Sequence, residues 1–84
     1  MFQVKVATPE RVIFDDSVDD LVIEGEAGQL NILERHTNFV SFIRPGPLLL
    51  RRNKQSVAEF SLSEGVLKVE GSVVMVLCSE AKAA

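Results

Sequence analysis

Apolar and polar residues alternate along much of this chain, most clearly at its start. Phe2, Val4 and Val6 alternate with polar neighbours, and Pro9 closes the run. A period of two places every second side chain on one face, as in a β-strand that buries only one side. We therefore predict a first strand over residues 2–7 with its polar face in water.

Similar short stretches, rich in β-branched and aromatic residues, continue to residue 78 and are separated by turn-forming residues. Asp15-Asp16-Ser17 is expected to be the turn of a hairpin, Arg44-Pro45-Gly46-Pro47 a tight turn, and Asn53-Lys54-Gln55 a hairpin tip. The predicted strands cover residues 2–7, 11–15, 18–24, 29–33, 39–43, 48–52, 56–62, 66–70 and 73–78.

No segment shows a period of 3.6 residues over a length that could form a core helix. Many short strands with frequent turns are typical of an antiparallel β-sandwich or flattened barrel. We predict a single all-β domain over residues 1–80, with no core helix. Residues 81–84 are expected to form a short frayed tail, because an isolated helical turn is not stable in water.

Several predicted strands are apolar on both faces. The core of a sandwich receives one face of each strand, and no helices are predicted to cover the other. Contiguous outward apolar residues would mark a partner site, whereas scattered ones, or ones covered by loops, would not. The stretches concerned are Val12–Phe14, Leu21–Ile23, Leu48–Leu50 and Val73–Cys78.

Length and composition restrict the class of protein. The chain has 84 residues, of which 46% are hydrophobic and 25% charged, as in one ordinary globular domain. Its apolar runs are far shorter than the roughly 20 residues of a membrane-spanning helix, so we expect no direct membrane insertion. No secretory leader is visible at the start. Cys78 is the only cysteine, which excludes an internal disulfide, and we expect it to be buried and inert.

Charge is unevenly distributed along the chain. Residues 1–34 carry eight acidic and two basic side chains, whereas residues 35–54 carry five basic and no acidic ones. This asymmetry suggests docking against complementary charged surfaces, and the alternative is that these segments are solvated loops. The formal net charge of −3 argues against nucleic acid as the main ligand.

Few residues could carry catalysis or hold a cofactor. His36 is the only histidine, and the sequence signals no partner that would complete a nucleophilic or metal site with it. The aspartates between residues 15 and 20 lack the spacing of a calcium loop. Gly25 and Gly28 precede no helix, so they do not form a phosphate-binding loop. We expect no catalytic residue, no cofactor and no metal site.

Four segments together resemble the epsilon subunit of F-type ATP synthases, in order and spacing. The resemblance covers nearly the whole chain. The segments are Phe2-x-Val4-x-Val6-x-Thr8-Pro9-Glu10-Arg11, Val22 to Leu33 followed by His36, Ile43-x-Pro45-Gly46-Pro47-Leu48, and Phe60 to Leu67 followed by Val69.

The resemblance implies a ten-stranded antiparallel β-sandwich at the foot of the central stalk, which turns with the rotor. Such a subunit is not catalytic: it binds the gamma subunit and the ring of c subunits, and so couples ion translocation to ATP synthesis. It would lie peripherally at the cytoplasmic face of the inner or plasma membrane. The alternative, from another class, is a free-standing β-sandwich module that recognises a peptide or another protein.

The resemblance also implies two contact surfaces. Gln29 stands where the family often has an acidic residue, and Glu34-Arg35-His36 replaces a common Pro-Gly-His. The turn facing the c-ring would comprise Glu26, Ala27, Gly28 and Gln29. The side facing gamma would include Thr8, His36 and Ser41.

Members of the family usually continue into two helices that can restrain ATP hydrolysis. A natural end at Ala84 would correspond to a short form that assembles and couples without this brake. If the chain is instead a piece of a longer one, the brake lies outside it.

Overall fold

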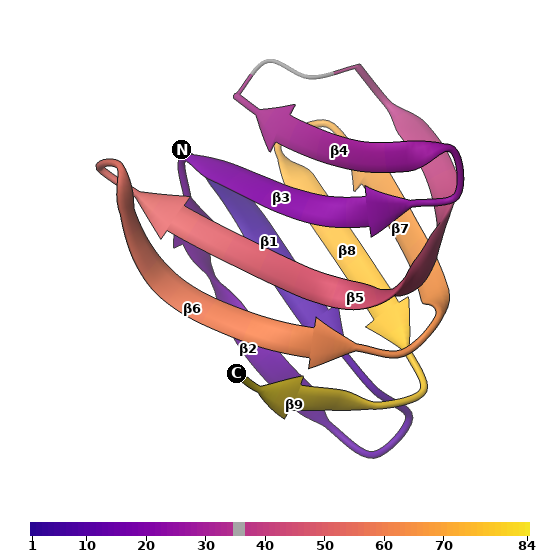
Figure 1. Ribbon diagram of the computed structural model, residues 1–84. Helices are drawn as coiled ribbons and strands as arrows, with labels where there is room; N and C mark the ends of the chain where they lie inside the picture. Colours follow the sequence, from indigo (N-terminus) through magenta and orange to yellow (C-terminus); the bar gives the residue numbers. More distant parts are fainter. Residues whose placement is uncertain (35–36) are drawn as a thin grey trace.

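The computed structural model describes residues 1–34 and 37–84, which form nine strands and no helix. All nine belong to one continuous sheet that folds over into two layers (Figure 1). The predicted all-β class is confirmed. The strands are β1 (Phe2–Ala7), β2 (Val12–Val18), β3 (Asp20–Gly25), β4 (Gly28–Leu33), β5 (Phe39–Arg52), β6 (Gln55–Leu62), β7 (Gly65–Glu70), β8 (Val73–Cys78) and β9 (Ala81–Ala83).

Three long antiparallel stretches run through both layers. The first is β5, the second is β6 followed by β7, and the third is β8 followed by β9. Residues 39–43 of β5 pair with β7, and residues 46–52 pair with β6. In the same way, β8 pairs with β7 and β9 with β6. All three stretches bend at one level, which we call the corner: residues 44–47, 63–64 and 79–80.

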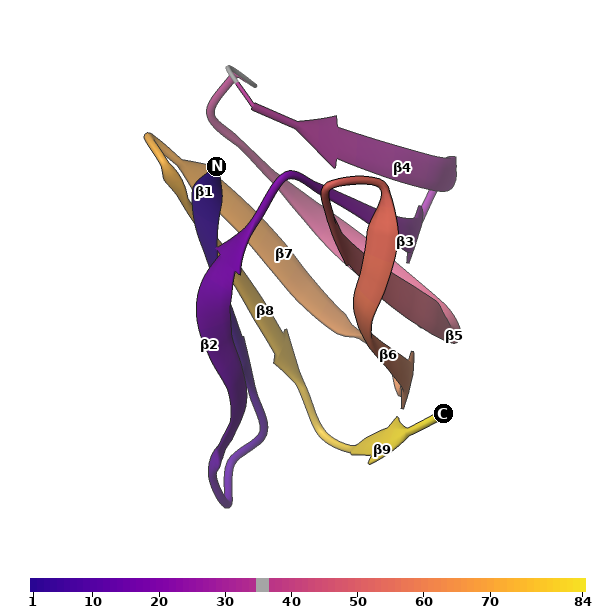
Figure 2. The same cartoon turned by 90° about the vertical axis from the view of Figure 1, so that its left-hand side faces the viewer.

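Each layer contains five strand segments when the two halves of β5 are counted separately. The layer that lies behind in Figure 1, the back layer, has the order β2-β1-β8-β7-β5 and uses the first half of β5. The front layer has the order β9-β6-β5-β3-β4 and uses the second half. Figure 2 shows the two layers from the side. The structure therefore has nine strands where ten were expected, because the long strand β5 contributes one segment to each layer.

The segment Arg44-Pro45-Gly46-Pro47 is not the tight turn that the sequence predicted. It lies inside β5, where the partner strand changes from β7 to β6 between Ile43 and Gly46. Proline has no N–H to donate to a ladder, so pairing is interrupted here and the strand bends. β7 pairs with β5 before this point and β6 pairs with it afterwards. The chain therefore bends here and continues in the same general direction, without reversing.

Ser63 joins two of the three stretches at the corner. Its N–H donates to the Glu80 carbonyl oxygen (3.0 Å), and the Glu80 N–H donates to Ser63 Oγ (2.9 Å). The Ser63 and Ser79 hydroxyl oxygens are 2.8 Å apart and share a hydrogen bond. These bonds satisfy backbone groups that the bend would otherwise leave without ladder partners.

The predicted hairpin of residues 11–15 and 18–24 is wrong. Residues 12–18 form one strand, β2, which pairs antiparallel with β1 from Phe2–Val18 to Ala7–Val12. The chain then crosses to the front layer at Asp19. β2 tolerates the acidic side chains of its middle because it is an edge strand of the back layer, where they reach water.

The core fills the space between the two layers. The strictly alternating burial of β1 confirms the predicted first strand. Burial raises the pKa of the Cys78 thiol, which fits the expected inert side chain. In the part of the chain that the structure describes, no polar or charged residue is buried. The buried side chains are those of Phe2, Val4, Val6, Val18, Leu21, Ile23, Ile32, Ile43, Leu48, Leu50, Leu62, Leu67, Val69, Val74, Val76 and Cys78.

A hairpin tip lies where the sequence predicts it, at residues 53–54, but residues 81–83 do not fray. Asn53 and Lys54 have φ of 54° and 63° and connect β5 to β6, as expected of a two-residue hairpin tip. The tail that was expected to fray instead forms β9, which pairs with β6. Ala81 packs against the core, and this tertiary contact supplies the stability that a short isolated segment lacks.

The acidic and basic poles of the sequence meet at one end of the sandwich. Arg51 Nε donates to Asp20 Oδ1 (2.7 Å), and the Asn53 N–H donates to Asp19 Oδ2 (2.7 Å). Part of the charge asymmetry, which suggested docking on external charged surfaces, is thus used within the chain.

Arg52 links this end of β5 to the edge strand β2. Its Nε donates to the Ser17 carbonyl oxygen (3.0 Å), and its Nη2 lies 3.2 Å from Asp16 Oδ2. The pKa of the Asp16 carboxyl is lowered, mainly because the carboxylate accepts the Ser17 N–H (2.7 Å) and then because of Arg52. The link fastens β2 of the back layer to the front layer.

Acid is expected to weaken the Asp16–Arg52 link. Because the folded pKa of Asp16 lies below its unfolded value of about 3.9, its contribution is present above that value and is lost as pH falls through the folded pKa. We expect Arg52→Gln to lower the urea midpoint more at pH 7 than at pH 3. Lys68→Gln, which removes only an exposed pair with Glu70, is the control. Equal losses at both pH values for Arg52→Gln would contradict this assignment.

Candidate protein-binding surface

A row of apolar side chains crosses the outer side of the back layer. In register, Phe42 pairs with Val66, Val66 with Leu77, Leu77 with Ala7, and Ala7 with Val12. Residues paired across neighbouring strands lie on the same face of a sheet. The row therefore extends over all five segments of the back layer, from β5 to β2.

Further apolar side chains continue this row along β5 and β8, next to the outward side chains of Lys5, Lys68 and Glu70. Val40 and Phe42 are each 65% exposed, Leu77 is 46% exposed and Val73 is 42% exposed. A contiguous exposed apolar patch is unusual on a soluble monomer and is typical of a protein contact surface. We call it the apolar face: Ala7, Val12, Val40, Phe42, Val66, Val73, Met75 and Leu77.

The outer side of the front layer is different. Val22 and Leu49 are neighbours in register there, but both are half-buried. Their other register partners on that side, Asn31 and Glu59, are polar. The outward positions of Leu21–Ile23 and Leu48–Leu50 therefore form no patch, whereas Leu77 of β8 and Val12 at the start of β2 belong to the continuous apolar row.

The β3–β4 turn borders the apolar face. Glu26, Ala27, Gly28 and Gln29 are all exposed, and Gly28 has a φ of 139°, which only glycine adopts easily. The Glu26 N–H donates to the Phe42 carbonyl oxygen (3.0 Å). This bond fixes the turn beside the most exposed aromatic ring of the face.

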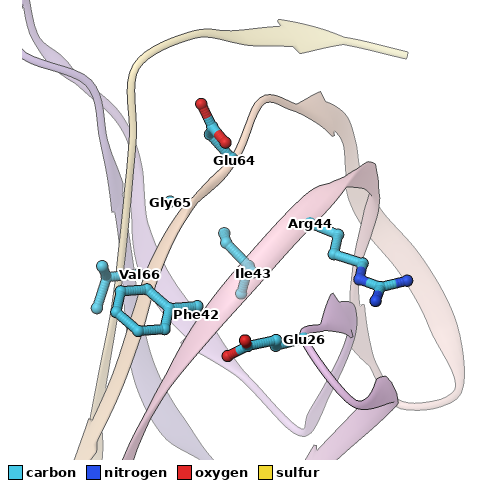
Figure 3. Close-up of a pocket in the computed structure, with 7 residues that line it drawn as sticks. All are labelled: Glu26, Phe42, Ile43, Arg44, Glu64, Gly65 and Val66. Atoms are coloured by element: carbon cyan, nitrogen blue, oxygen red, sulfur yellow. The ribbon is translucent and has the colours of Figure 1, made fainter.

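A hollow of about 410 Å³ opens where this turn, the corner and the apolar face meet. Phe42 and Val66 stand side by side on one of its walls, and Ile43 lies between them and Arg44 (Figure 3). Glu26 and Glu64 lie at opposite ends, and the Arg44 guanidinium points away from both. Gly65 completes the lining.

Residues 1–34 and 37–84 contain no group of three or more His, Cys, Asp or Glu side chains placed to hold a metal ion. They also contain no helix long and apolar enough to cross a membrane.

The whole chain, residues 1–84, matches the model of the family described as ATP synthase, Delta/Epsilon chain, beta-sandwich domain. The chain belongs to this family. It is 33% identical over 81 residues to the ATP synthase epsilon chain of Persephonella marina, and 35% identical over 81 residues to that of Nitrosococcus oceani. Each match covers 96% of this chain but only 60% and 58% of the relative. The chain thus spans about three-fifths of these relatives.

Solved structures show the same fold. A chain of the Euglena gracilis mitochondrial ATP synthase superposes with a TM-score of 0.87 at 20% identity, over 95% of this chain and 51% of that one. A chain of the Tetrahymena thermophila mitochondrial ATP synthase central stalk and c-ring gives 0.81 at 16% identity, over 95% and 64%. At these identities the likeness concerns the fold.

The other residues implied by the resemblance to epsilon chains lie apart in this delta/epsilon domain. Thr8 is in the β1–β2 turn, where its N–H donates to the Arg11 carbonyl oxygen (2.9 Å). Ser41 lies in β5 opposite the buried Leu67, and its Oγ donates to the Phe42 carbonyl oxygen (2.9 Å). In the sheet, β8 and β7 lie between β1, which precedes Thr8, and β5, which contains Ser41. His36 lies outside the described residues.

Val40 and Phe42, the most exposed members of the apolar face, were not predicted as outward apolar residues. Their segment, Phe39–Ile43, was predicted as a strand, but it was not included among those with two apolar faces. The available signal was its composition, since four of its five residues are apolar.

Proposed function

We propose that this chain is a non-catalytic part of the rotor of an ATP synthase, in which it binds the gamma subunit and the c-ring. It helps to couple ion translocation to ATP synthesis, at the cytoplasmic face of the membrane and without inserting into it. The observation that carries the proposal is the apolar face, which extends over five strands of a domain whose relatives are ATP synthase epsilon chains.

The apolar face supplies the proposed gamma-binding surface. Burial of its exposed side chains on a partner provides a favourable free energy in rough proportion to the area covered. Thr8 borders this surface at the β1–β2 turn. Ser41 and His36 are assigned to the gamma side by resemblance alone, since the Ser41 side chain shares the inner face of the back layer with Leu67.

The β3–β4 turn supplies the proposed contact with the c-ring. Glu26 to Gln29 are all exposed, and they project next to the apolar face, so one domain can touch two neighbours at once. Gln29 is neutral, so Glu26 carries the negative charge of this turn. The proposed role needs no bond-making chemistry: it needs a stiff body that joins two partners.

Capture of the gamma subunit tests the proposal. We expect Val73→Asp and Leu77→Asp to weaken binding of purified gamma at least about tenfold each, because each buries a carboxylate in an apolar contact. The matched control is Val57→Asp. Val57 is 41% exposed, against 42% for Val73, but lies on β6 in the front layer, so gamma binding should be unchanged.

Two outcomes would overturn the proposal. Unchanged capture by Val73→Asp and Leu77→Asp, with urea midpoints like that of Val57→Asp, would exclude the apolar face as the gamma site. Failure of the wild-type chain to capture gamma would favour the alternative of a free-standing recognition module for a peptide or another protein.

A further inference from the structure

A second hollow, of about 240 Å³, lies on the outer side of the back layer, where β7 ends and β8 begins. It is lined by Lys68 and Glu70 of β7 and by Val73 and Met75 of β8. In register, Lys68 pairs with Met75 and Glu70 with Val73. Because register partners share a face of the sheet, these four side chains form one block that points outward, and two of them belong to the apolar face.

The two sides of this hollow differ in their chemistry. On β8, Val73 is 42% exposed and Met75 is half-buried, so this side is apolar. On β7, Lys68 Nζ lies 3.3 Å from Glu70 Oε2, so this side is an ion pair. Both charged side chains are largely exposed to water in the free chain, at 54% and 69%. A partner that covers the apolar face therefore also removes water from this pair.

The chemistry of the lining selects the side chain that can fill the hollow. An aliphatic side chain would cover Val73 and Met75 but would desolvate the ion pair without compensation, which is costly. An aromatic ring attracts the Lys68 ammonium through its face and makes a favourable contact with the Met75 thioether. The O–H of tyrosine or the N–H of tryptophan can in addition donate to the Glu70 carboxylate. Among the described residues, none that lines the hollow is aromatic, so the ring has to come from the partner.

We infer that the gamma subunit places a tyrosine or tryptophan side chain in this hollow. Its ring covers Val73 and Met75 beside the Lys68 ammonium, and its polar edge lies toward Glu70. The inference rests on the proposed function, because it names the contact that fixes gamma on the apolar face. Tyrosine and tryptophan in desolvated pockets are enriched among the residues that dominate the binding free energy of an interface. The hollow is thus the anchor point of this surface.

The methyl NMR signals of the full chain, prepared with isotope-labelled methionine, test the inference. Met1 and Met75 are the only two methionines, and the chain contains no tyrosine or tryptophan. We expect binding of purified, unlabelled gamma to move the signal of the Met75 methyl group upfield, because a ring stacked on a methyl group shields it. Met1 does not line the hollow and serves as the internal reference, with no comparable upfield shift.

A matched pair of lysine variants tests the contribution of the ammonium. Lys5 and Lys68 both pair in register with Met75, from β1 on one side and from β7 on the other. Of these two lysines, Lys68 alone lines the hollow. Lys68→Gln should weaken gamma binding about threefold, as expected for the loss of one contact between a cation and a ring. Lys5→Gln removes the same charge from the same face and should bind gamma like the wild type.

Three outcomes would overturn the inference, and they distinguish it from the proposed function. If gamma binds but the Met75 methyl signal shows no upfield shift, the aromatic anchor is excluded while gamma binding stands. If Lys5→Gln weakens binding as much as Lys68→Gln, the ammonium acts only through the general charge of the face, and the ring contact is excluded. If gamma does not bind the wild-type chain at all, the proposed function and the anchor fail together.

Discussion

Leu48→Ala is expected to lower the free energy of unfolding by about 3 kcal/mol, and Leu49→Ala by about 1 kcal/mol or less. Leu48 has no exposed surface and pairs in register with the buried Ile23 and with Phe60, which packs against the core. Leu49 is half-buried on the outer side of the front layer. Urea unfolding, followed by circular dichroism, gives both values.

The comparison of these two neighbours tests the bend in β5 as well as the core. The structure requires that the alternation of buried and outward residues resumes after Pro47 with Leu48 inside. Equal losses for the two variants, or a greater loss for Leu49→Ala, would mean that the chain leaves the corner with the opposite face inward.

Gly65→Ala is expected to cost about 3 kcal/mol of stability. A Cβ at this position would lie 2.0 Å from the Leu77 carbonyl oxygen and 2.9 Å from Cys78 Cα. Both are backbone atoms of β8, so the clash is relieved only if β7 and β8 move apart and their ladder is disturbed. Urea unfolding of the purified variant measures the loss.

Gly46→Ala provides the control for Gly65→Ala. Its added Cβ would meet Glu24 Cγ at 2.9 Å, but that atom belongs to a flexible side chain that can turn aside. We expect a loss of about 1 kcal/mol or less. If the two glycine variants are equally stable, β8 does not approach β7 as closely as the structure shows.

Local patterns were sufficient to locate most strands but not to pair them. The alternation of residues 2–7 and the glycines at 25 and 28 indicate strand and turn directly. β2 was assigned to the wrong partner because three polar residues, Asp15 to Ser17, look like a turn. They lie in a strand because that strand is at the edge of the sheet, and edge position is decided by residues far away in the sequence.

The corner could not be distinguished from a turn for a related reason. Proline and glycine at residues 45–47 interrupt pairing in either case. Whether the chain reverses or only bends depends on the neighbouring strands, and here β6 and β7 continue along β5 on both sides of the interruption. Only the pairing of all three long stretches distinguishes the two outcomes.

The candidate site was predicted in part. Outward apolar residues in β8 were foreseen from their continuous run, whereas Val40 and Phe42 were missed. Phe39 and Ile43 are as apolar as these two, so the segment itself does not indicate which face is buried. The charged poles were recognised as well, but a sequence does not show that Arg51 and Arg52 already have acidic partners in the same chain.

The shared corner has a consequence for how the domain bears force. Because β5, β6–β7 and β8–β9 each pass from one layer to the other, the two layers are continuations of the same covalent strands at that edge. A pull on the outer side of the back layer is transmitted to the front layer along peptide bonds as well as through side-chain packing. Sliding of one layer over the other would require these three stretches to unbend together. We therefore expect the two layers to twist together as one rigid body.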